Sequence, residues 1–449
     1  MGDNPIILVS LHKNLINNNI MVKRFLTLLS IFLVAVVTMA QLPKDEISAD
    51  PRLSGSNHLA YPGPLQSRLT PAPKGYRPFY ISHYGRHGSR YLIGPDEYDV
   101  PVKVLARADS LGKLTPLGRD VLRRARLLKE EARGRLGELT PLGAEQHRQI
   151  ARRMYERFPE VFKGNVTVDA KSTVVIRCIL SMENELQELL LHNPKLDIKH
   201  DASEHDMYYM NQSDPSLSSQ KMPRRALVAW NDFCARHVSR APLMKRLFND
   251  DTYVKYEVDT LDLGNRLFKL AANVQSSPLG EKMSLFDIFT KDELYNFWMA
   301  DNASWYIGYG ACKLNGATQP YSQRNLLRNI IHQADSCIAL EHPGATLRFG
   351  HETMVLPLTC LLGINGYDLE TDDLESLVDK GWINYKVFPM GANIQLVFYR
   401  RNASDEDVLV KVLLNENETT LPVPTDCAPY YHWNDFKAYY QKKLDAYGK

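Results

Sequence analysis

A histidine flanked by two arginines stands after a short segment with the composition of a β-strand. The segment 78–82 runs into Arg86, His87, Gly88 and Arg90. Guanidinium groups present planar forks of N–H donors that match phosphate oxygens, and glycine lets the backbone approach a bound anion closely. A histidine can act as a nucleophile when its second nitrogen is held by an acceptor. These residue types predict an anion-binding turn that carries a nucleophile.

Two further groups of polar residues follow predicted strands elsewhere in the chain. The β-rich segment that begins at Val166 ends in Arg177, and the strand predicted over 345–350 is followed by His351 and Glu352. In open α/β sheets, ligands bind at the carboxyl ends of the strands. We therefore expect these side chains to meet the histidine–arginine turn at one edge of a sheet.

Each of these residues also has an ordinary alternative. His87 could be a structural histidine, and Arg177 a surface arginine in a salt bridge. Glu352 stands at a predicted helix start, where a carboxylate complements the helix dipole in any case. A functional site is favoured because all of these residues stand at the ends of predicted strands.

The elements that position these residues alternate between strands and helices. Two copies of Leu-Thr-Pro-Leu-Gly, at 114–118 and 139–143, predict helix starts, because threonine suits the N-cap and proline the first helical position. Further helices are expected at about 181–192, 322–340 and 353–362. Two late strands are expected at 394–399 and 408–414, as antiparallel neighbours.

This alternation predicts an α/β fold: an open, mostly parallel sheet with helices on both faces, plus an inserted, mainly α-helical domain. Residues 203–315 carry many aromatics and helical periodicity, and so form the predicted insertion. The division we expect is an N-terminal extension and signal peptide (1–40), the first part of the α/β domain (41–202), the inserted domain (203–315) and the second part of the α/β domain (316–449). The Pro-, Ser- and Gly-rich stretch 41–75 is expected to be an irregular lead-in.

Several of these segments resemble one known family. Residues 86–90 match the RHGxR signature of the histidine phosphatase superfamily, in its acid phosphatase and phytase branch. In the order of that branch, 137–146 resembles its Thr-x-x-Gly-x-x-Gln helix start, 173–181 its pocket-arginine segment, and 350–352 its distal histidine followed by an acid. Segments 391–400 and 408–416 look like the multiple inositol polyphosphate phosphatases, and the similarity spans most of residues 77–445.

The resemblance implies a double displacement. His87 would attack phosphorus in line and form a phosphohistidine, which water then hydrolyses. The phosphoryl oxygens would be bound by Arg86, Arg90, Arg177 and His351. An acid next to His351 would protonate the leaving alcohol oxygen. Neither a metal nor an organic cofactor is implied.

The chain departs from the family pattern in two places. Leu92 stands where the branch often has proline, which mainly directs the backbone. The distal motif is His351-Glu352-Thr353, whereas the acid phosphatases and phytases have His-Asp and the inositol polyphosphate group typically has His-Ala-Glu. Glu352 is the best candidate for the proton donor. It stands directly after the histidine, as the aspartate of the first group does, but has the longer side chain of the second group's glutamate.

Composition and charge set broad limits on function. The chain has 449 residues, of which 44% are hydrophobic and 24% charged, as in globular proteins. A net charge of +2 does not predict nucleic-acid binding. The six cysteines are scattered without CxxC or zinc-finger spacing, so both disulfides and buried free thiols stay open.

The N-terminus has the features of a secretory signal peptide. Lys23 and Arg24 precede the apolar run 25–37, and Thr38-Met39-Ala40 provides a small-residue cleavage site before Gln41. We expect a secreted or periplasmic protein with no stable membrane insertion after cleavage. An uncleaved anchor is the alternative, and translation starts at either Met1 or Met21.

Taken together, the sequence predicts a secreted phosphomonoesterase that acts on inositol polyphosphates, phytate included. Its alternatives are a broad-specificity histidine acid phosphatase for sugar phosphates and other small monoesters, and a secreted protein that binds a phosphorylated ligand without catalysis. Phosphate release from phytate against p-nitrophenyl phosphate discriminates between them. The first phosphate removed, the residues that bind the non-reacting phosphates, the disulfide pairing and the oligomeric state stay open.

Overall fold

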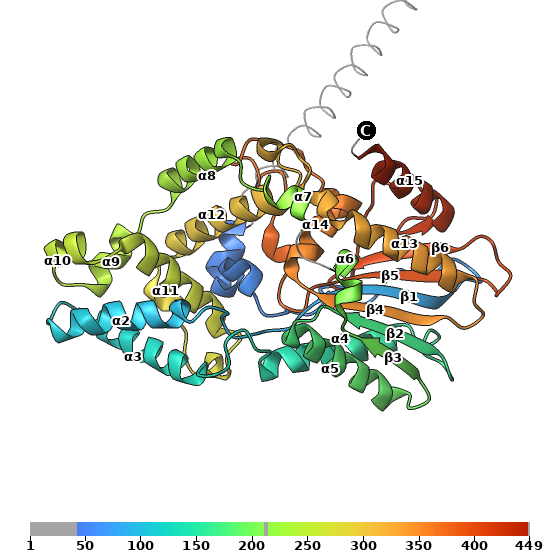
Figure 1. The fold of residues 1–449 in the computed structure, drawn as a ribbon, viewed down its shortest axis with the longest axis horizontal. Helices are drawn as coiled ribbons and strands as arrows, with labels where there is room; N and C mark the ends of the chain where they lie inside the picture. Colours follow the sequence, from blue (N-terminus) through green and yellow to red (C-terminus); the bar gives the residue numbers. More distant parts are fainter. Residues whose placement is uncertain (1–42, 211–213, 448–449) are drawn as a thin grey trace, which may run out of the picture.

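A mixed β-sheet forms the centre of one half of the molecule (Figure 1). The computed structural model describes residues 43–210 and 214–447. The strand order is β3-β2-β4-β1-β5-β6-β7, with β8 also paired to β6. The first four strands in this order are mutually parallel, and β5 to β8 are added antiparallel. The strands are β1 (Arg77–Arg86), β2 (Thr167–Ser172), β3 (Asp197–Asp201), β4 (Gly344–Gly350), β5 (Asn393–Arg400), β6 (Leu409–Leu414), β7 (Asn417–Glu418) and β8 (Tyr430–His432).

Helices cover both faces of this sheet, so the predicted α/β class is confirmed. One face packs against α4 (Pro141–Arg157) and α5 (Ile176–His192). The other packs against α13 (Arg324–Ile338), α14 (Glu352–Leu362) and α15 (Trp433–Ala446). Successive side chains of a strand point to opposite faces, and the neighbours Tyr80 and Ile81 accordingly belong to the two different cores.

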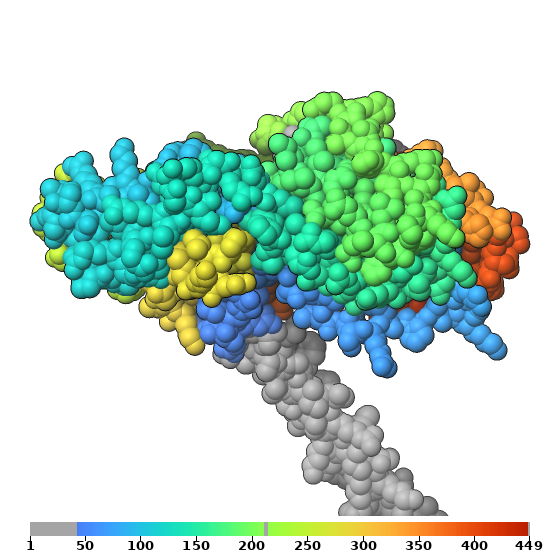
Figure 2. Space-filling model, turned by 90° about the horizontal axis from the view of Figure 1, so that it is seen from below, coloured from blue at the N-terminus to red at the C-terminus, as the bar shows by residue number. Residues whose placement is uncertain are grey.

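The other half of the molecule is helical. Its core combines residues 91–132 with residues 238–300 and a few from 378–385. In Figure 2 the residues of α2 and α3 (cyan) occupy one end of the molecule, and those of α5 and β3 (green) lie in the other half. The division of the chain into domains stays a prediction. The remaining helices are α2 (Asp96–Ser110), α3 (Pro116–Glu131), α6 (Met207–Met210), α7 (Pro215–Ser218), α8 (Arg224–His237), α9 (Ala241–Leu247), α10 (Asp251–Glu257), α11 (Thr260–Val274) and α12 (Lys291–Tyr309).

Both Leu-Thr-Pro-Leu-Gly segments start helices as predicted. Thr115 and Thr140 are the N-caps of α3 and α4, and each side chain accepts a hydrogen bond from the backbone N–H three residues later. The predicted antiparallel neighbours β5 and β6 are also present. These local signals are robust because a helix cap and a run of strand-forming residues both depend on residues close in sequence.

Two local predictions were wrong. The β-rich segment predicted to end in Arg177 stops being a strand at Ser172, and Arg177 lies in the first turn of α5. Its β-branched residues Val174 and Ile176 are exposed rather than paired in the sheet. The lead-in predicted to be irregular contains a helical stretch at 43–49 and a 3₁₀ helix, η1 (Pro51–His58).

The predicted signal peptide lies outside the described residues. Among the helices within them, none has both the length and the apolar character needed to cross a membrane. All six cysteines fall in the described part of the chain, and each is a free thiol there.

Candidate active site

Two parallel neighbouring strands place the predicted residues side by side. Arg86, the last residue of β1, lies opposite Gly350, the last residue of β4. The backbone N–H of His87 donates to the carbonyl of Gly350 at 2.9 Å, which joins the two strand ends. The motifs 86–90 and 350–352 are more than 260 residues apart in sequence, yet the sheet register makes them one site.

His87 is oriented by its own loop. Its Nδ1 lies 2.9 Å from the carbonyl oxygen of Gly88 and donates to it, since a carbonyl only accepts. The proton on Nδ1 leaves the lone pair on Nε2 available. Burial, followed by the charges of Arg86, Arg177 and Arg90, holds the pKa of His87 well below its usual value. The ring is therefore neutral and nucleophilic at Nε2.

The glycines under this loop allow close packing of two backbones. A Cβ on Gly88 would lie 2.4 Å from the carbonyl oxygen of Gly143 at the start of α4. The next residue, Ser89, donates its backbone N–H to Gln146 Oε1 at 2.8 Å. The Thr-x-x-Gly-x-x-Gln segment thus packs against the loop 86–90. Thr140 caps α4 and donates to the Ser89 carbonyl, and Gly143 and Gln146 contact the same loop.

The arginines around His87 carry buried donors that have no protein partner. Arg86 uses Nη1 to hold the carbonyl of Phe388 at 2.7 Å, and Arg90 uses Nη1 to hold that of Tyr91 at 3.0 Å. Nη2 of Arg86, Nε of Arg90 and Nε of Arg177 are buried without a hydrogen-bond acceptor in the described structure. Leaving one such donor unpaired costs about 1–3 kcal/mol. An arrangement that leaves several unpaired in one place fits an anion.

Glu352 faces His87 across this pocket. Its Oε2 lies 3.7 Å from His87 Nε2 and 3.0 Å from Arg86 Nε. Burial alone would raise the pKa of Glu352, but the nearby charges of Arg86 and Arg90 outweigh it and lower the pKa to about 2. The carboxylate is therefore ionised while no anion occupies the pocket. Its position at the first residue of α14 is also the helix-start position that the dipole favours.

His351 stands at right angles to His87, with 5.6 Å between the ring centres. Burial is the main cause that lowers its pKa to about 4, so the ring is neutral near pH 7. Its Nε2 lies 3.6 Å from Cys178 Sγ, and its Nδ1 is buried without a partner in the described structure. The thiol has one proton and also contacts the Gly350 carbonyl at 3.3 Å, so the ring proton lies on Nδ1, as a further donor for an anion, only when the thiol turns to Nε2.

The structure thus brings all six predicted residues to one place. Arg86, His87, His351 and Glu352 are in direct contact or ring-packed, and Arg90 and Arg177 lie close enough for their charges to lower the pKa of His87. Arg177 reaches the pocket from the first turn of α5 instead of from a strand end. The roles of these residues remain predictions.

Sequence reasoning missed two residues that contact this set. Asn57, at the end of η1, donates from Nδ2 to Glu352 Oε1 at 3.3 Å. Its stretch of the chain carries no motif, so no sequence signal pointed to it. Cys178 contacts His351 as described above, and its place directly after Arg177 in the pocket-arginine segment was the available signal.

A cavity of about 660 Å³ borders the site. None of the six predicted residues lines it; Asn57 and the buried His58, whose pKa is lowered first by burial and then by Arg90, connect it to the pocket. Its walls come from η1, α8, α11 and α12 and include the aromatic rings of Trp230, Phe268, Phe297 and Trp305 and the cationic side chains of Arg240 and Lys269.

Comparisons with known proteins give one matching family and several similar folds. The model of the histidine phosphatase superfamily (branch 2) matches residues 86–415. No curated protein matches the chain. Among solved structures, the chain is similar to a Bifidobacterium longum multiple inositol polyphosphate phosphatase in complex with inositol hexasulfate, with a TM-score of 0.73, 18% identity and coverage of 88% of this chain and 99% of that one. It is also similar to a phytase from D. castellii, with a TM-score of 0.63, 15% identity and coverage of 88% and 85%. A Hafnia alvei phytase in complex with myo-inositol hexakis sulphate gives a TM-score of 0.53 at 13% identity, with coverage of 83% and 98%.

Proposed function

Because this chain belongs to the histidine phosphatase superfamily (branch 2), we propose that it hydrolyses inositol polyphosphates, phytate included, through a phosphohistidine on His87. It is a histidine-type phosphatase. The observation that carries the proposed mechanism is the position of His87. Its Nδ1 is held by the Gly88 carbonyl, while its Nε2 lies 3.7 Å from a carboxylate and among three guanidinium groups.

In the first step, the lone pair of His87 Nε2 attacks phosphorus in line with the ester bond. The N–P bond forms as the P–O bond breaks, and the leaving alkoxide takes the proton of Glu352. The charge on the non-bridging oxygens spreads during transfer, and the unpaired donors of Arg86, Arg90 and Arg177 stabilise it.

Glu352 must be protonated to act as the acid, although its pKa is about 2 in the anion-free pocket. The negative charge of a bound phosphoryl group opposes the charge of Arg86 and Arg90. Substrate binding therefore raises the pKa of this carboxyl. In the second step, water attacks the phosphohistidine, Glu352 accepts a proton from that water, and the bond to Nε2 breaks to release inorganic phosphate.

The substrate class rests on two observations. The cavity beside Glu352 is large enough for a ring with several substituents, and Arg240 gives it a cationic side chain, whereas Lys269 pairs with Glu97 at 2.6 Å and Asp301 also stands in the lining. Two of the similar structures were solved with inositol hexasulfate or myo-inositol hexakis sulphate, analogues of a fully phosphorylated inositol. Both favour a substrate whose non-reacting phosphates lie in this cavity.

A second candidate is a broad-specificity acid phosphatase for sugar phosphates. The four aromatic rings that line the cavity favour this alternative, because sugar rings pack on aromatic surfaces whereas additional phosphates do not need them. The two functions differ in how kcat/KM depends on the number of phosphates in the substrate.

Two experiments test the proposal. Phytate turnover with chromatography of the products measures whether successive phosphates are released, and a sugar phosphate hydrolysed with the same kcat/KM would favour the second candidate.

Rapid quenching with labelled substrate should locate the label on His87. His87→Ala should abolish turnover and leave phosphate binding, because the arginine donors remain. Substantial turnover by this variant would exclude the phosphohistidine mechanism.

A further inference from the structure

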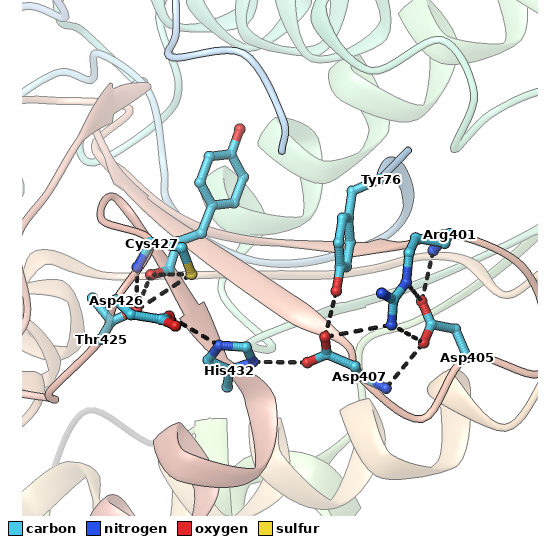
Figure 3. A network of polar contacts seen from close by, with 9 residues as sticks. Tyr76, Arg401, Asp405, Asp407, Thr425, Asp426, Cys427 and His432 are labelled. Carbon is cyan, nitrogen blue, oxygen red and sulfur yellow. Dashed lines mark hydrogen bonds and ion pairs between the residues drawn. The ribbon is translucent and has the colours of Figure 1, made fainter. Parts of the chain in front are cut away.

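A second group of chemically reactive side chains lies at the end of the sheet opposite the active site. Asp426 and Cys427 precede β8, and His432 is its last residue (Figure 3). His432 pairs with Leu409, where β6 begins, whereas the active site lies where β1 ends. The ten residues of β1 separate the two ends by roughly 30 Å, at about 3.3 Å per residue. This group therefore has no part in the phosphatase pocket.

The three side chains offer the ligand types that zinc prefers. His432 Nε2 lies 3.1 Å from Asp426 Oδ1, and these atoms and Cys427 Sγ all lie within 4.8 Å of one another. In a tetrahedral site, Zn–N and Zn–O bonds of about 2.0 Å and a Zn–S bond of about 2.3 Å place the ligand atoms about 3.3 to 3.5 Å apart. The nitrogen–oxygen pair, at 3.1 Å, is close to this spacing, and the sulfur, which contacts the Tyr430 carbonyl at 3.5 Å, must turn from it toward the other two atoms.

The imidazole is already oriented for a metal. His432 Nδ1 lies 2.7 Å from Asp407 Oδ1, and Asp407 Oδ2 accepts from the hydroxyl of Tyr76 at 2.5 Å. Arg401 also contacts Asp407, at 3.4 Å, and holds Asp405 beside it. A carboxylate on the second nitrogen fixes the tautomer of a metal-binding histidine and makes its free nitrogen a better ligand. Asp407 comes from a different loop and is not one of the three ligands, so the orienting contact is independent of the cluster itself.

Charge and burial are also compatible with a bound zinc ion. A thiolate at Cys427 and the carboxylate of Asp426 would balance its two positive charges. Burial raises the pKa of the Cys427 thiol, so the metal must displace the thiol proton on binding. The cysteine and histidine are half-buried, whereas the Asp426 side chain is 83% exposed and leaves a path for the ion to enter.

We propose that Asp426, Cys427 and His432 form a zinc site with three protein ligands, in which water is the fourth ligand and Asp407 orients the histidine. The ion would close the loop before β8 and fix the edge of the sheet where α15 begins, at Trp433. The sequence has no CxxC or zinc-finger spacing that would predict this site, because strand pairing and loop folding bring the ligands together. The proposal does not depend on the phosphatase activity.

Without metal, the same contacts describe a protonated His432 between two carboxylates. Hydrogen bonding to Asp407 raises the pKa of this histidine and favours that alternative. The two states differ in whether a thiolate takes part, and Co²⁺ reports this directly, since a thiolate ligand gives a charge-transfer absorption and tetrahedral Co²⁺ gives strong visible bands.

The experiment is a Co²⁺ titration of the full chain, stripped with a chelator and kept reduced. We expect thiolate-to-cobalt absorption that saturates at one ion per chain and is displaced by Zn²⁺, and a higher Tm with Zn²⁺ because the ion binds only the folded state. Cys427→Ser should lose the charge-transfer band, whereas Cys337→Ser, at another half-buried free thiol, should keep it. Asp407→Asn should weaken binding by about 10–100-fold.

Asp426→Asn gives a second test at an exposed position that folding tolerates, and it should weaken Co²⁺ binding while the melting curve without metal stays the same. A wild-type chain without the charge-transfer band, or a band that survives in Cys427→Ser, would overturn the proposal. In the first case, His432 bridges the two carboxylates as a cation.

Discussion

The carboxylate of Glu352 lies 3.7 Å from His87 Nε2, a spacing too short to hold a phosphorus atom, its leaving oxygen and a hydrogen bond in one line. Both groups are buried, and they come from the ends of two strands that pair in parallel. In-line displacement puts the nucleophile and the leaving oxygen on opposite sides of phosphorus, so the Glu352 side chain must move away from Nε2 before it can protonate that oxygen.

Replacing Glu352 should produce a loss that depends on the leaving group. An inositol alkoxide must be protonated as it leaves, whereas p-nitrophenolate leaves without help, and general acid catalysis is worth about 10²–10⁴-fold. We expect Glu352→Gln to lose about that much kcat on phytate and far less on p-nitrophenyl phosphate. The measurement is kcat on both substrates at several pH values. Equal losses on both would mean that Glu352 positions the pocket and that the proton comes from another group.

Cys178 should act on catalysis through His351. Cys178→Ala removes the thiol that faces both Nε2 and the Gly350 carbonyl, and so tests whether this thiol holds the ring proton on Nδ1. We expect phosphate inhibition to weaken by about tenfold, the value of a hydrogen bond to a charged group of roughly 1.5 kcal/mol. Cys178→Ser, which keeps a donor, should restore most of it.

The pH dependence distinguishes this role from simple packing. Below the His351 pKa of about 4, both ring nitrogens carry protons whatever residue stands at 178. The difference between Cys178→Ala and wild type should therefore be present above that pH and shrink as the pH falls through it. Parallel profiles of the phosphate inhibition constant over the whole range would show that Cys178 only fills space.

Arg240 should contribute to the recognition of non-reacting phosphates. Its guanidinium donates to the neutral amide of Asn265 and lies over the ring of Phe297, so its charge is available to a ligand in the cavity. We expect Arg240→Gln to raise KM for phytate by up to about fivefold at low salt, with less effect at high salt because exposed charges are screened. The kcat on p-nitrophenyl phosphate should not change.

The matched control for this variant is Arg236→Gln. Arg236 is an exposed arginine near the same cavity, but it pairs with Glu375 and does not line the cavity. The same rise in KM for both variants would show a nonspecific loss of positive charge, and Arg240 would then not contact the substrate.

Export predicts a processed N-terminus. If the apolar run 25–37 belongs to a signal peptide, the exported protein should begin at or near Gln41. N-terminal sequencing of the protein recovered outside the cytoplasm checks this. Intact Met1 or Met21 on that material would show that the segment is not removed.

Much of the site could be predicted because its residues stand in local motifs. The RHGxR turn and the His351-Glu352 pair follow strands that are buried along most or all of their length, and the rule that ligands bind at strand ends brought them together. The two Thr-Pro helix starts were equally local, because their capping contacts span only three residues.

The rest depended on contacts between distant parts of the chain. Asn57 reaches Glu352 across 295 residues from a stretch with no periodicity, so only the folded structure reveals it. Arg177 was assigned to a strand end because Val174 and Ile176 have strand propensity. Propensity is a weak guide where the chain leaves the sheet and those side chains are exposed.

The unpaired guanidinium donors around His87 have a consequence for the end of the reaction. A pocket that binds the transferring phosphoryl group through these donors offers the same contacts to the inorganic phosphate left after hydrolysis. Bound phosphate then competes with the next substrate, and accumulated phosphate would slow the enzyme. A substrate with many phosphates offsets this, because only its additional charges reach the cationic side chain of Arg240 in the neighbouring cavity.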